Sequence, residues 1–293
     1  MITEEKIINS RIGIVANDAG GSNYIYSFII NHSISPFLFC SGPAVDIFKL
    51  VSNAKVTSSI DEIISKVDIL IFSSGSPSGF EINALKYSKD KVLTLSFIDH
   101  WTNYLTRFKI KNEIILPDAL IVYDKHAYDA AKQQFPKNTN ILLFDNYYMQ
   151  NQIIESNKFE RKNDYILYID EPIKNHPNTL INYNYDEFFA FKLFLKLKSK
   201  TKYKDDNIMI RLHPSQSNQN KYSEFINADQ NIYISKNNTL AHDIVKSKIV
   251  VGFESMALAV ALELKKPVFS IIPNNGKSSS LPFNEIKLFY NEV

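Results

Sequence analysis

A glycine-rich turn that carries an acid follows the first apolar run of the chain. Residues 17–23 read Asn-Asp-Ala-Gly-Gly-Ser-Asn. Glycines let backbone N–H groups approach a ligand closely, and a helix that begins here presents the positive end of its dipole to an anion. We predict that Gly20, Gly21 and Ser22 contact a phosphate and that the Asp18 carboxylate acts as a general base. The alternative is that Asp18 and Ser22 only cap the helix.

A His-Pro pair ends a later apolar run. The segment reads Arg211-Leu212-His213-Pro214. Pro214 stops a strand, so His213 is expected at its carboxyl end, where an imidazolium can bind or protonate a phosphate oxygen. The alternative is a histidine that is hydrogen-bonded into the loop. A second His-Pro pair, at 176–177, lies in a polar stretch where a structural turn is the favoured interpretation.

A third polar segment reads Gly252-Phe253-Glu254-Ser255 and precedes a helical pattern. Ser255 is expected at the helix N-cap, where its hydroxyl and the first-turn N–H groups form a phosphate site. Glu254 can hydrogen-bond a ribose or a base. A plain N-cap is the alternative for Ser255. We predict that His213 and Ser255 hold one phosphate from the ends of two neighbouring strands.

Residues 97–108 interleave polar and aromatic side chains, including the only tryptophan of the chain. Polar groups bind sugar hydroxyls and ring faces cover sugar C–H surface, so Asp99, His100, Trp101 and Asn103 are predicted to bind a sugar acceptor. The alternative is a loop that the tryptophan pins. The adjacent acid and histidine rival Asp18 as the catalytic base, but one such pair is too few ligands for a metal.

Ser74 belongs to a run of small hydroxyl residues, 73–79, which follows another apolar run. We assign Ser74 to the acceptor side of the site. The alternative is a flexible turn that caps the next helix.

These segments follow short apolar runs that alternate with helical patterns. Near-continuous apolar strands between helices indicate a parallel sheet covered on both faces, with its ligand at the carboxyl ends of the strands. We predict an α/β protein with two Rossmann-like domains facing a cleft, 1–155 for the acceptor and 156–293 for the donor, joined by a polar stretch at 151–164. The predicted strands are 12–16, 37–39, 68–72, 92–97, 119–122, 141–144, 165–169, 208–212, 232–234, 249–251 and 268–272. The predicted helices are 24–30, 45–51, 60–65, 80–88, 128–134, 186–199, 240–245 and 255–264.

The bulk composition excludes several classes of protein. The 293 residues carry a net charge of +2, which is too small to indicate nucleic-acid binding. The single cysteine cannot form an internal disulfide, no apolar run approaches the roughly 20 residues of a membrane span, and the first ten residues do not resemble a secretory signal. We therefore expect a cytoplasmic protein.

A lysine-rich stretch within 192–204 interrupts an otherwise apolar helical pattern. It predicts either a solvated helix face or a peripheral attraction to anionic lipid at the inner face of the cell membrane. Its lysines are Lys192, Lys196, Lys198, Lys200, Lys202 and Lys204.

The order of the His-Pro pair and the helix-opening serine resembles that of bacterial sialyltransferases and related GT-B transferases, which use CMP-activated nonulosonic acids or Kdo. The resemblance covers residues 165–273. It implies that His213 and Pro214 contact the donor phosphate, that Ser255 also binds it, and that Asp18 is the base. Transfer would be inverting, would need neither a metal nor a cofactor beyond the CMP-sugar donor, and would deliver the sugar to a glycan or glycolipid acceptor.

One departure from the family pattern concerns its paired hydroxyl motif, which here is Glu254-Ser255 with a single hydroxyl. The aspartate is assigned from its place in the fold. The donor-binding set is then Arg211, His213, Pro214, Glu254, Ser255, Gly20, Gly21 and Ser22.

Three other readings stay open. A CDP-polyol phosphotransferase of the teichoic-acid type would need a second histidine, from His100 or His176. An enzyme that uses a UDP-sugar, either a GT-B transferase or a UDP-sugar 2-epimerase, would share the architecture. A non-catalytic nucleotide-sugar-binding protein would not need both Asp18 and His213.

Overall fold

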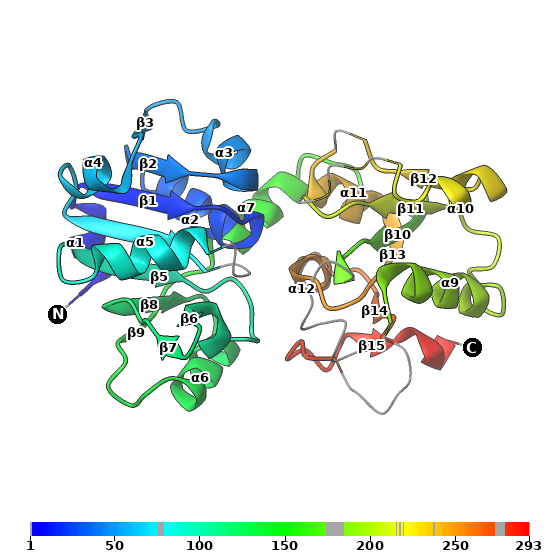
Figure 1. Cartoon of the computed structure of the whole chain (residues 1–293). Coiled ribbons are helices and arrows are strands. Elements are labelled where there is room, and N and C mark those ends of the chain that lie inside the picture. Colours follow the sequence, from blue (N-terminus) through cyan, green and yellow to red (C-terminus); the bar gives the residue numbers. More distant parts are fainter. Residues whose placement is uncertain are drawn as a thin grey trace. The chain divides into compact units, whose positions relative to one another are not determined.

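The structure is a computed structural model that describes residues 2–74, 79–173, 185–214, 216, 218, 220–236, 238–272 and 279–292. The chain folds into two compact units, Met1–Tyr148 and Met149–Val293 (Figure 1). The boundary between the two units, after Tyr148, lies within helix α7 (Tyr147–Ser156). The sequence analysis places this boundary at 155/156. The polar junction predicted at 151–164 is therefore helical in its first part.

In its described residues, the N-terminal unit has a parallel sheet of seven strands in the order β3-β2-β1-β4-β5-β8-β9. The central strands are buried along their whole length, which explains their unbroken apolar sequences. The strands are β1 (Ile12–Ala16), β2 (Phe37–Cys40), β3 (Lys55–Val56), β4 (Ile69–Ser73), β5 (Leu93–Phe97), β8 (Ala119–Val122) and β9 (Ile141–Leu143). A small antiparallel pair, β6 (Lys109–Ile110) and β7 (Glu113–Ile114), lies outside this sheet.

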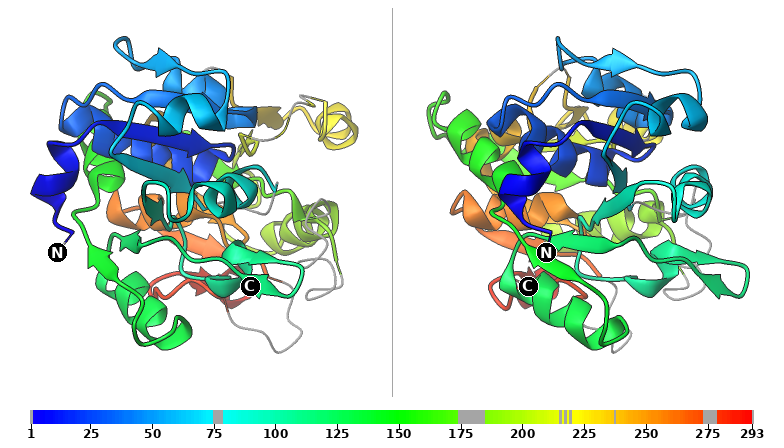
Figure 2. Two further views of the ribbon diagram at one scale, coloured as in Figure 1. Left: turned by 60° about the vertical axis from the view of Figure 1, so that its left-hand side comes forward. Right: turned by 90° about the vertical axis from the view of Figure 1, so that its left-hand side faces the viewer.

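Helices cover both faces of this sheet (Figures 1 and 2). The chain runs from β1 through β2 to the edge strand β3 and then returns to β4 and β5 on the other side of β1. Because parallel crossovers are right-handed, the helices of the first part, α2 and α3, lie on one face of the sheet, and those of the second part, α4 and α5, lie on the other. Helix α2 accordingly contacts α3, and α4 contacts α5. The helices are α1 (Glu4–Ile8), α2 (Ala19–Asn31), α3 (Gly42–Phe48), α4 (Ile60–Ile64), α5 (Phe80–Ser88), the 3-10 helix η1 (Leu105–Phe108) and α6 (Lys125–Gln134).

The C-terminal unit repeats this plan. Over its described residues, six parallel strands follow the order β12-β11-β10-β13-β14-β15. The strands are β10 (Tyr165–Ile169), β11 (Ile208–Arg211), β12 (Ile232–Ile234), β13 (Ser247–Gly252), β14 (Val268–Ser270) and β15 (Lys287–Leu288). The helices are α9 (Glu187–Lys198), α10 (Ser223–Ala228), α11 (Leu240–Lys246), α12 (Met256–Glu263) and the 3-10 helix η3 (Phe289–Glu292).

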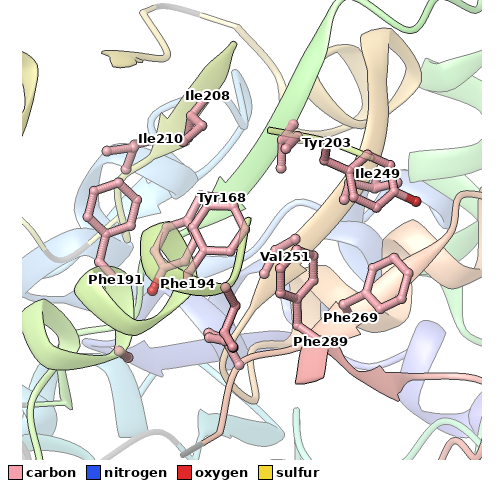
Figure 3. Close-up of a cluster of buried hydrophobic side chains, with 14 of the residues drawn as sticks. Tyr168, Phe191, Phe194, Tyr203, Ile208, Ile210, Ile249, Val251, Phe269 and Phe289 are labelled. Atoms are coloured by element: carbon pink, nitrogen blue, oxygen red, sulfur yellow. The ribbon is translucent and has the colours of Figure 1, made fainter. Parts of the chain in front are cut away.

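An aromatic core lies between this second sheet and α9 (Figure 3). Phe191 and Phe194 of α9 are fully buried, and both rings pack edgewise or tilted against Tyr168 of β10. Phe289 of η3 closes the cluster, with its ring edgewise to Phe194 and to Phe269. Burial of such side chains stabilises a fold by roughly 1.5–3 kcal/mol each, so this unit has a core of its own.

The predicted class, an α/β protein with parallel sheets, is confirmed. The predicted helix at 24–30 begins earlier, because Asp18 caps α2 and residues 19–23 form its first turn. Helices α3 and α6 also begin three residues before their predicted starts. Several elements were not predicted: the helices α1, α7 and α10, the 3-10 helices η1 and η3, and the two-residue strands β3, β6, β7 and β15.

Candidate active site

Each sheet has one point where the strand order reverses: between β1 and β4 in the N-terminal unit, and between β10 and β13 in the C-terminal unit. The helices that follow these two strands leave toward opposite faces, which opens a crevice at their carboxyl ends. Asp18 follows β1 and Ser74 follows β4. In the other sheet, Glu171 follows β10 and Glu254 follows β13. Sequence reasoning predicted Asp18, Ser74 and Glu254 at strand ends without knowing the strand order, and it missed Glu171.

Asp18 is the centre of an acidic cluster in the N-terminal unit. Its Oδ2 accepts a hydrogen bond from the Gly21 N–H at 2.8 Å, which caps α2. Oε1 of Glu81, on α5, accepts from the Asn17 N–H at 2.8 Å and from the Asp18 N–H at 3.3 Å. Burial raises the pKa of Asp18 to about 6; the charges of Asp99 and Glu81 add to the rise, and the Gly21 N–H opposes it. This carboxyl group therefore titrates close to neutral pH, as a general base does.

Asp99 reaches the same cluster from the loop after β5. A Cβ placed on Gly20 would lie 2.0 Å from Asp99 Oδ2 and 3.3 Å from Asp18 Oδ2, so both carboxylates border the first turn of α2. Arg107 pairs with Asp99 at 2.7 Å, and its guanidinium also donates to the Ser74 carbonyl oxygen. The Ser74 hydroxyl donates to the Phe97 carbonyl oxygen at 2.5 Å. Arg107 thus ties the end of β4 to the loop that carries Asp99.

In the rest of the loop after β5, Trp101 is buried, whereas His100 and Asn103 are at least partly accessible to solvent. Trp101 is 8% exposed, and its indole N–H donates to Asp124 Oδ2 at 2.9 Å. These contacts favour the structural reading for the tryptophan. His100 is half-buried with its Nδ1 3.1 Å from the Thr102 hydroxyl, and Asn103 is exposed in a left-handed conformation at φ 60°. Acceptor contacts therefore suit His100 and Asn103 better than Trp101.

The prediction that Gly20, Gly21 and Ser22 bind a phosphate does not agree with this geometry. Ser22 is fully buried, and the Gly21 N–H is taken by Asp18. A Cβ on Gly21 would lie 2.8 Å from the Ser73 Cβ, so this glycine allows α2 to approach β4. A phosphate at this helix end would also face the carboxylates of Asp18, Asp99 and Glu81, which repel it.

In the C-terminal unit, two glutamates meet at the crevice. Oε2 of Glu171 accepts a hydrogen bond from the Glu254 N–H at 3.0 Å, and the Glu254 carboxylate accepts from the Ser280 N–H. Burial raises the pKa of Glu171 to about 7; the charges of Glu254 and Asp170 add to this rise, and the hydrogen bond from the Glu254 N–H opposes it. Ser255 is the N-cap of α12, and its hydroxyl accepts from the Ala257 N–H at 3.2 Å. Two carboxyl groups that accept backbone hydrogen bonds thus lie close to the N-terminus of α12.

His213 and Ser255 do not follow neighbouring strands, which corrects the prediction. Strand β10 lies between β11 and β13, so their ends are about 10 Å apart at ordinary strand spacing. His213 is half-buried, and its carbonyl accepts from the Gln216 N–H at 2.9 Å, while Pro214 is exposed. A single phosphate group is too small to span two strand spacings, but a nucleotide is not.

The guanidinium of Arg211 forms its contacts with residues of the C-terminal unit. Its guanidinium pairs with the fully buried Asp243 at 2.6 Å and donates to the Asn238 carbonyl at 3.0 Å. Ser235 donates to the same carboxylate at 2.5 Å. These contacts give Arg211 a structural role, and its contact with a donor stays a prediction.

Sequence reasoning missed the buried network around Asp170. This carboxylate, directly after β10, accepts from Lys221 Nζ at 2.9 Å and from the Tyr222 hydroxyl at 2.7 Å. Lys221 also pairs with Glu187 at 3.0 Å. The Asp170 N–H donates to the Arg211 carbonyl at 2.9 Å, so Asp170 holds both ends of the segment that carries His213. The partners lie up to 52 residues apart, so no local motif indicates them.

Two of the sequence predictions lie wholly or partly outside the described residues: the second His-Pro pair, His176-Pro177, and positions 75–78 of the hydroxyl-rich run. The predicted basic run is not one solvated face, because Lys198 is buried and its Nζ donates to the Lys204 carbonyl at 2.7 Å. Within the described ranges, no helix is both long enough and apolar enough to cross a membrane.

Comparison with known proteins gives the fold a name. No protein-family model and no curated protein sequence matches the chain. The UDP-GlcNAc 2-epimerase of Neisseria meningitidis, bound to UDP-GlcNAc, is similar in structure, with a TM-score of 0.54 and 12% identity over 89% of this chain and 82% of the epimerase. A variant of the wall teichoic acid polymerase TagF has a TM-score of 0.51 and 14% identity over 92% of this chain and 71% of the polymerase. The chain therefore has the GT-B fold of two Rossmann-like units.

Proposed function

We propose that this chain is a glycosyltransferase that takes its sugar from a nucleotide-activated donor. The observation that carries the proposal is the Asp18 carboxyl group, whose pKa is raised to about 6 at the strand reversal of the N-terminal unit. A group with this pKa is mostly ionised at pH 7 and still accepts a proton readily. The shared fold with an epimerase bound to UDP-GlcNAc supports a nucleotide-linked substrate.

In the proposed reaction, Asp18 takes the proton from an acceptor hydroxyl as that oxygen attacks the anomeric carbon of the donor. The bond from this carbon to the phosphate oxygen breaks, and its electron pair leaves with the nucleotide. His100 and Asn103 are the proposed acceptor contacts, since both are accessible in the loop after β5. Arg107 keeps Asp99 beside Asp18 and so helps to maintain the raised pKa.

The C-terminal unit is the proposed donor site. Ser255 and the first-turn N–H groups of α12 would receive the phosphate, where developing charge is stabilised by fixed dipoles. Glu171 and Glu254 would hydrogen-bond the ribose hydroxyls. His213, one strand spacing beyond β10, would contact a different part of the nucleotide from Ser255.

For the donor itself, a CMP-linked nonulosonic acid or Kdo is the finer proposal, and it depends on His213-Pro214 and Ser255. A CDP-linked polyol is the second candidate, since the fold is shared with a wall teichoic acid polymerase. A UDP-sugar is the third, because of the likeness to the epimerase.

The base is tested by Asp18→Asn. Asparagine caps helices as well as aspartate does, so the fold should persist while the base is lost. We expect kcat to fall about 100- to 10,000-fold, measured by mass-spectrometric detection of released nucleotide. In the unaltered protein the rate should rise with pH through about 6, since the base must be ionised. Unchanged donor consumption by the Asp18→Asn protein would refute the assignment.

The donor class is tested by thermal shift with CMP, CDP, UDP and UMP, followed by turnover of the matching donors. A nucleotide that binds the native state raises its apparent stability. CMP stabilisation with CMP-sugar turnover supports the finer proposal, and CDP-polyol turnover supports the second candidate. Stabilisation by UDP alone contradicts a CMP donor. Binding without any turnover indicates a nucleotide-sugar-binding protein instead of an enzyme.

A further inference from the structure

A basic pocket lies at the amino ends of the strands of the C-terminal sheet, at the opposite edge from Ser255 and Glu254. It is open to solvent and has a volume of about 510 Å³. Its walls come from the segment before β10, the turn after α9, the start of β13 and the segment between α12 and β14. The lining residues are Arg161, Lys162, Asn163, Lys202, Tyr203, Lys248, Ile249, Lys265, Lys266 and Pro267.

Six of these lining residues are basic. Three have carboxylate partners: Lys248 with Asp206 at 2.5 Å, Lys162 with Glu160 at 3.8 Å, and Lys202 with Glu292 at 4.0 Å. The other three, Arg161, Lys265 and Lys266, form no ion pair with a carboxylate among the described residues. The pocket therefore holds an excess of positive charge.

Two of these three cations are fixed by backbone carbonyls. Arg161 donates to the Leu264 carbonyl at 3.0 Å. Lys266 is 8% exposed, and its Nζ donates to the Lys162 carbonyl at 3.1 Å and to the Ser247 carbonyl at 2.5 Å. Burial lowers the pKa of Lys266; the charge of Arg161 lowers it further, and Asp164 partly offsets the effect. An anion in the pocket would relieve this repulsion between fixed cations.

Lys265 occupies a backbone position that favours glycine. The Lys266 N–H bonds to the Ala261 carbonyl at 3.0 Å and the Lys265 N–H to the Leu262 carbonyl at 2.9 Å, which is the Schellman pattern at the end of α12. Lys265 has the left-handed φ of 61° that this pattern requires. A lysine here costs backbone energy that glycine would not, and its side chain is exposed at the pocket.

We propose that this pocket binds a phosphate ester. Guanidinium and ammonium groups are the usual protein ligands of phosphate, and the volume exceeds that of a single phosphate, so room remains for a sugar or glycerol attached to it. Two of the lining residues, Tyr203 and Ile249, are buried and also belong to the aromatic core (Figure 3). The ligand comes either from a soluble phosphate ester or from a phospholipid headgroup at a membrane surface. This site is independent of the proposed donor site at the other edge of the sheet.

The test compares the protein with the double variant Arg161→Gln/Lys265→Gln. Calorimetric titration with glycerol 3-phosphate and inorganic phosphate probes the soluble source, and flotation with phosphatidylglycerol or phosphatidylcholine vesicles probes the lipid source. Lys192→Gln/Lys196→Gln is the matched control, since it removes the same charge from exposed positions of α9 outside the pocket. Both variants are first checked for an unchanged circular dichroism spectrum.

Loss of two charge-assisted hydrogen bonds should weaken binding at least about tenfold in the pocket variant and leave the control unchanged. Binding of glycerol 3-phosphate with this pattern supports a soluble ligand. Flotation with phosphatidylglycerol alone, with the same dependence on Arg161 and Lys265, supports a lipid headgroup. The proposal is overturned if neither probe binds, if the pocket variant binds normally, or if both variants weaken equally, which would indicate general electrostatic attraction.

Discussion

Two sets of interactions act in opposite directions on the pKa of Asp18. As the N-cap of α2 it accepts a hydrogen bond from Gly21, which stabilises the ionised carboxylate. Burial and the charge of Asp99 act the other way and raise its pKa from 3.8 to about 6. Because the folded state then binds a proton more tightly than the unfolded state, this group reduces stability as pH rises from about 4 to 6. Such a cost at one residue is typical of a catalytic position.

This cost gives a stability prediction for Asp18→Asn. The neutral amide keeps the cap and avoids ionisation, so the variant should be more stable than the unaltered protein by about 1–3 kcal/mol at pH 8. The advantage should shrink as pH falls through 6 and vanish near pH 4. Urea unfolding at several pH values measures it. A constant difference between the two proteins from pH 4 to pH 8 would contradict the raised pKa.

Lys265 offers a second test at the scale of one residue. Lys265→Gly places the favoured residue at the left-handed C′ position of α12 and should stabilise the protein by about 1 kcal/mol. Lys265→Ala keeps the unfavourable backbone conformation and should bring no gain. Denaturant midpoints of the two variants are compared directly. Equal stability of the glycine and alanine variants would show that φ 61° carries no strain here.

At the scale of elements, the contact between α2 and β4 sets the geometry of the acidic cluster. A Cβ on Gly21 would lie 2.8 Å from the Ser73 Cβ and 3.2 Å from the Ser74 N, and this backbone cannot move aside easily. Gly21→Ala should therefore destabilise the protein by about 1–3 kcal/mol, although alanine is the better helix former. Thermal unfolding measures the loss.

Gly20→Ala is the matched control for this contact. The nearest atom to its new methyl group would be Asp99 Oδ2, at the end of a side chain that can rotate. We expect a smaller loss of stability than for Gly21→Ala. The apparent pKa of Asp18 in the pH–rate profile should shift, because Asp99 would move away from Asp18. If Gly20→Ala were the more destabilising of the two, the proposed packing of α2 on β4 would be wrong.

The elements differ in how well the sequence predicts them. Strands such as Ala119–Val122 and Tyr165–Ile169 are buried on both faces, so their apolar runs mark their full extent. Edge strands β3 and β15 have two residues each and no such run. The start of α2 was misplaced because its glycines are typical of a loop, whereas Gly21 is required here by the close approach of α2 to Ser73.

The candidate site was only partly predictable for a related reason. Asp18 and Ser255 each carry a local helix-capping signal, and the structure places both at N-caps. The strand order that separates His213 from Ser255 is a property of the whole sheet, and the pairing of Asp170 with Lys221 joins residues 51 positions apart. Such contacts arise from tertiary packing, which a local pattern does not encode.

At the scale of the whole molecule, two units that share their strand order over six strands carry different side chains at equivalent positions. Carboxylates surround the helix end after β1, while a serine cap and hydrogen-bonded glutamates mark the end of β13. This difference is the basis of our proposal that the phosphate of the donor binds at α12 and that the base lies at α2.

Amide hydrogen exchange tests whether the donor phosphate binds at α12 and not at α2. The nucleotide that most raises the melting temperature should slow amide exchange at residues 253–258, where the N–H groups of the first turn of α12 would meet its phosphate. Residues 19–24 should exchange at the unliganded rate, because Asp18, Asp99 and Glu81 repel a phosphate there. The corresponding nucleoside, which lacks the phosphate, is the control and should leave residues 253–258 unprotected. Protection at 19–24 without protection at 253–258 would reverse the assignment and place the donor on the N-terminal unit.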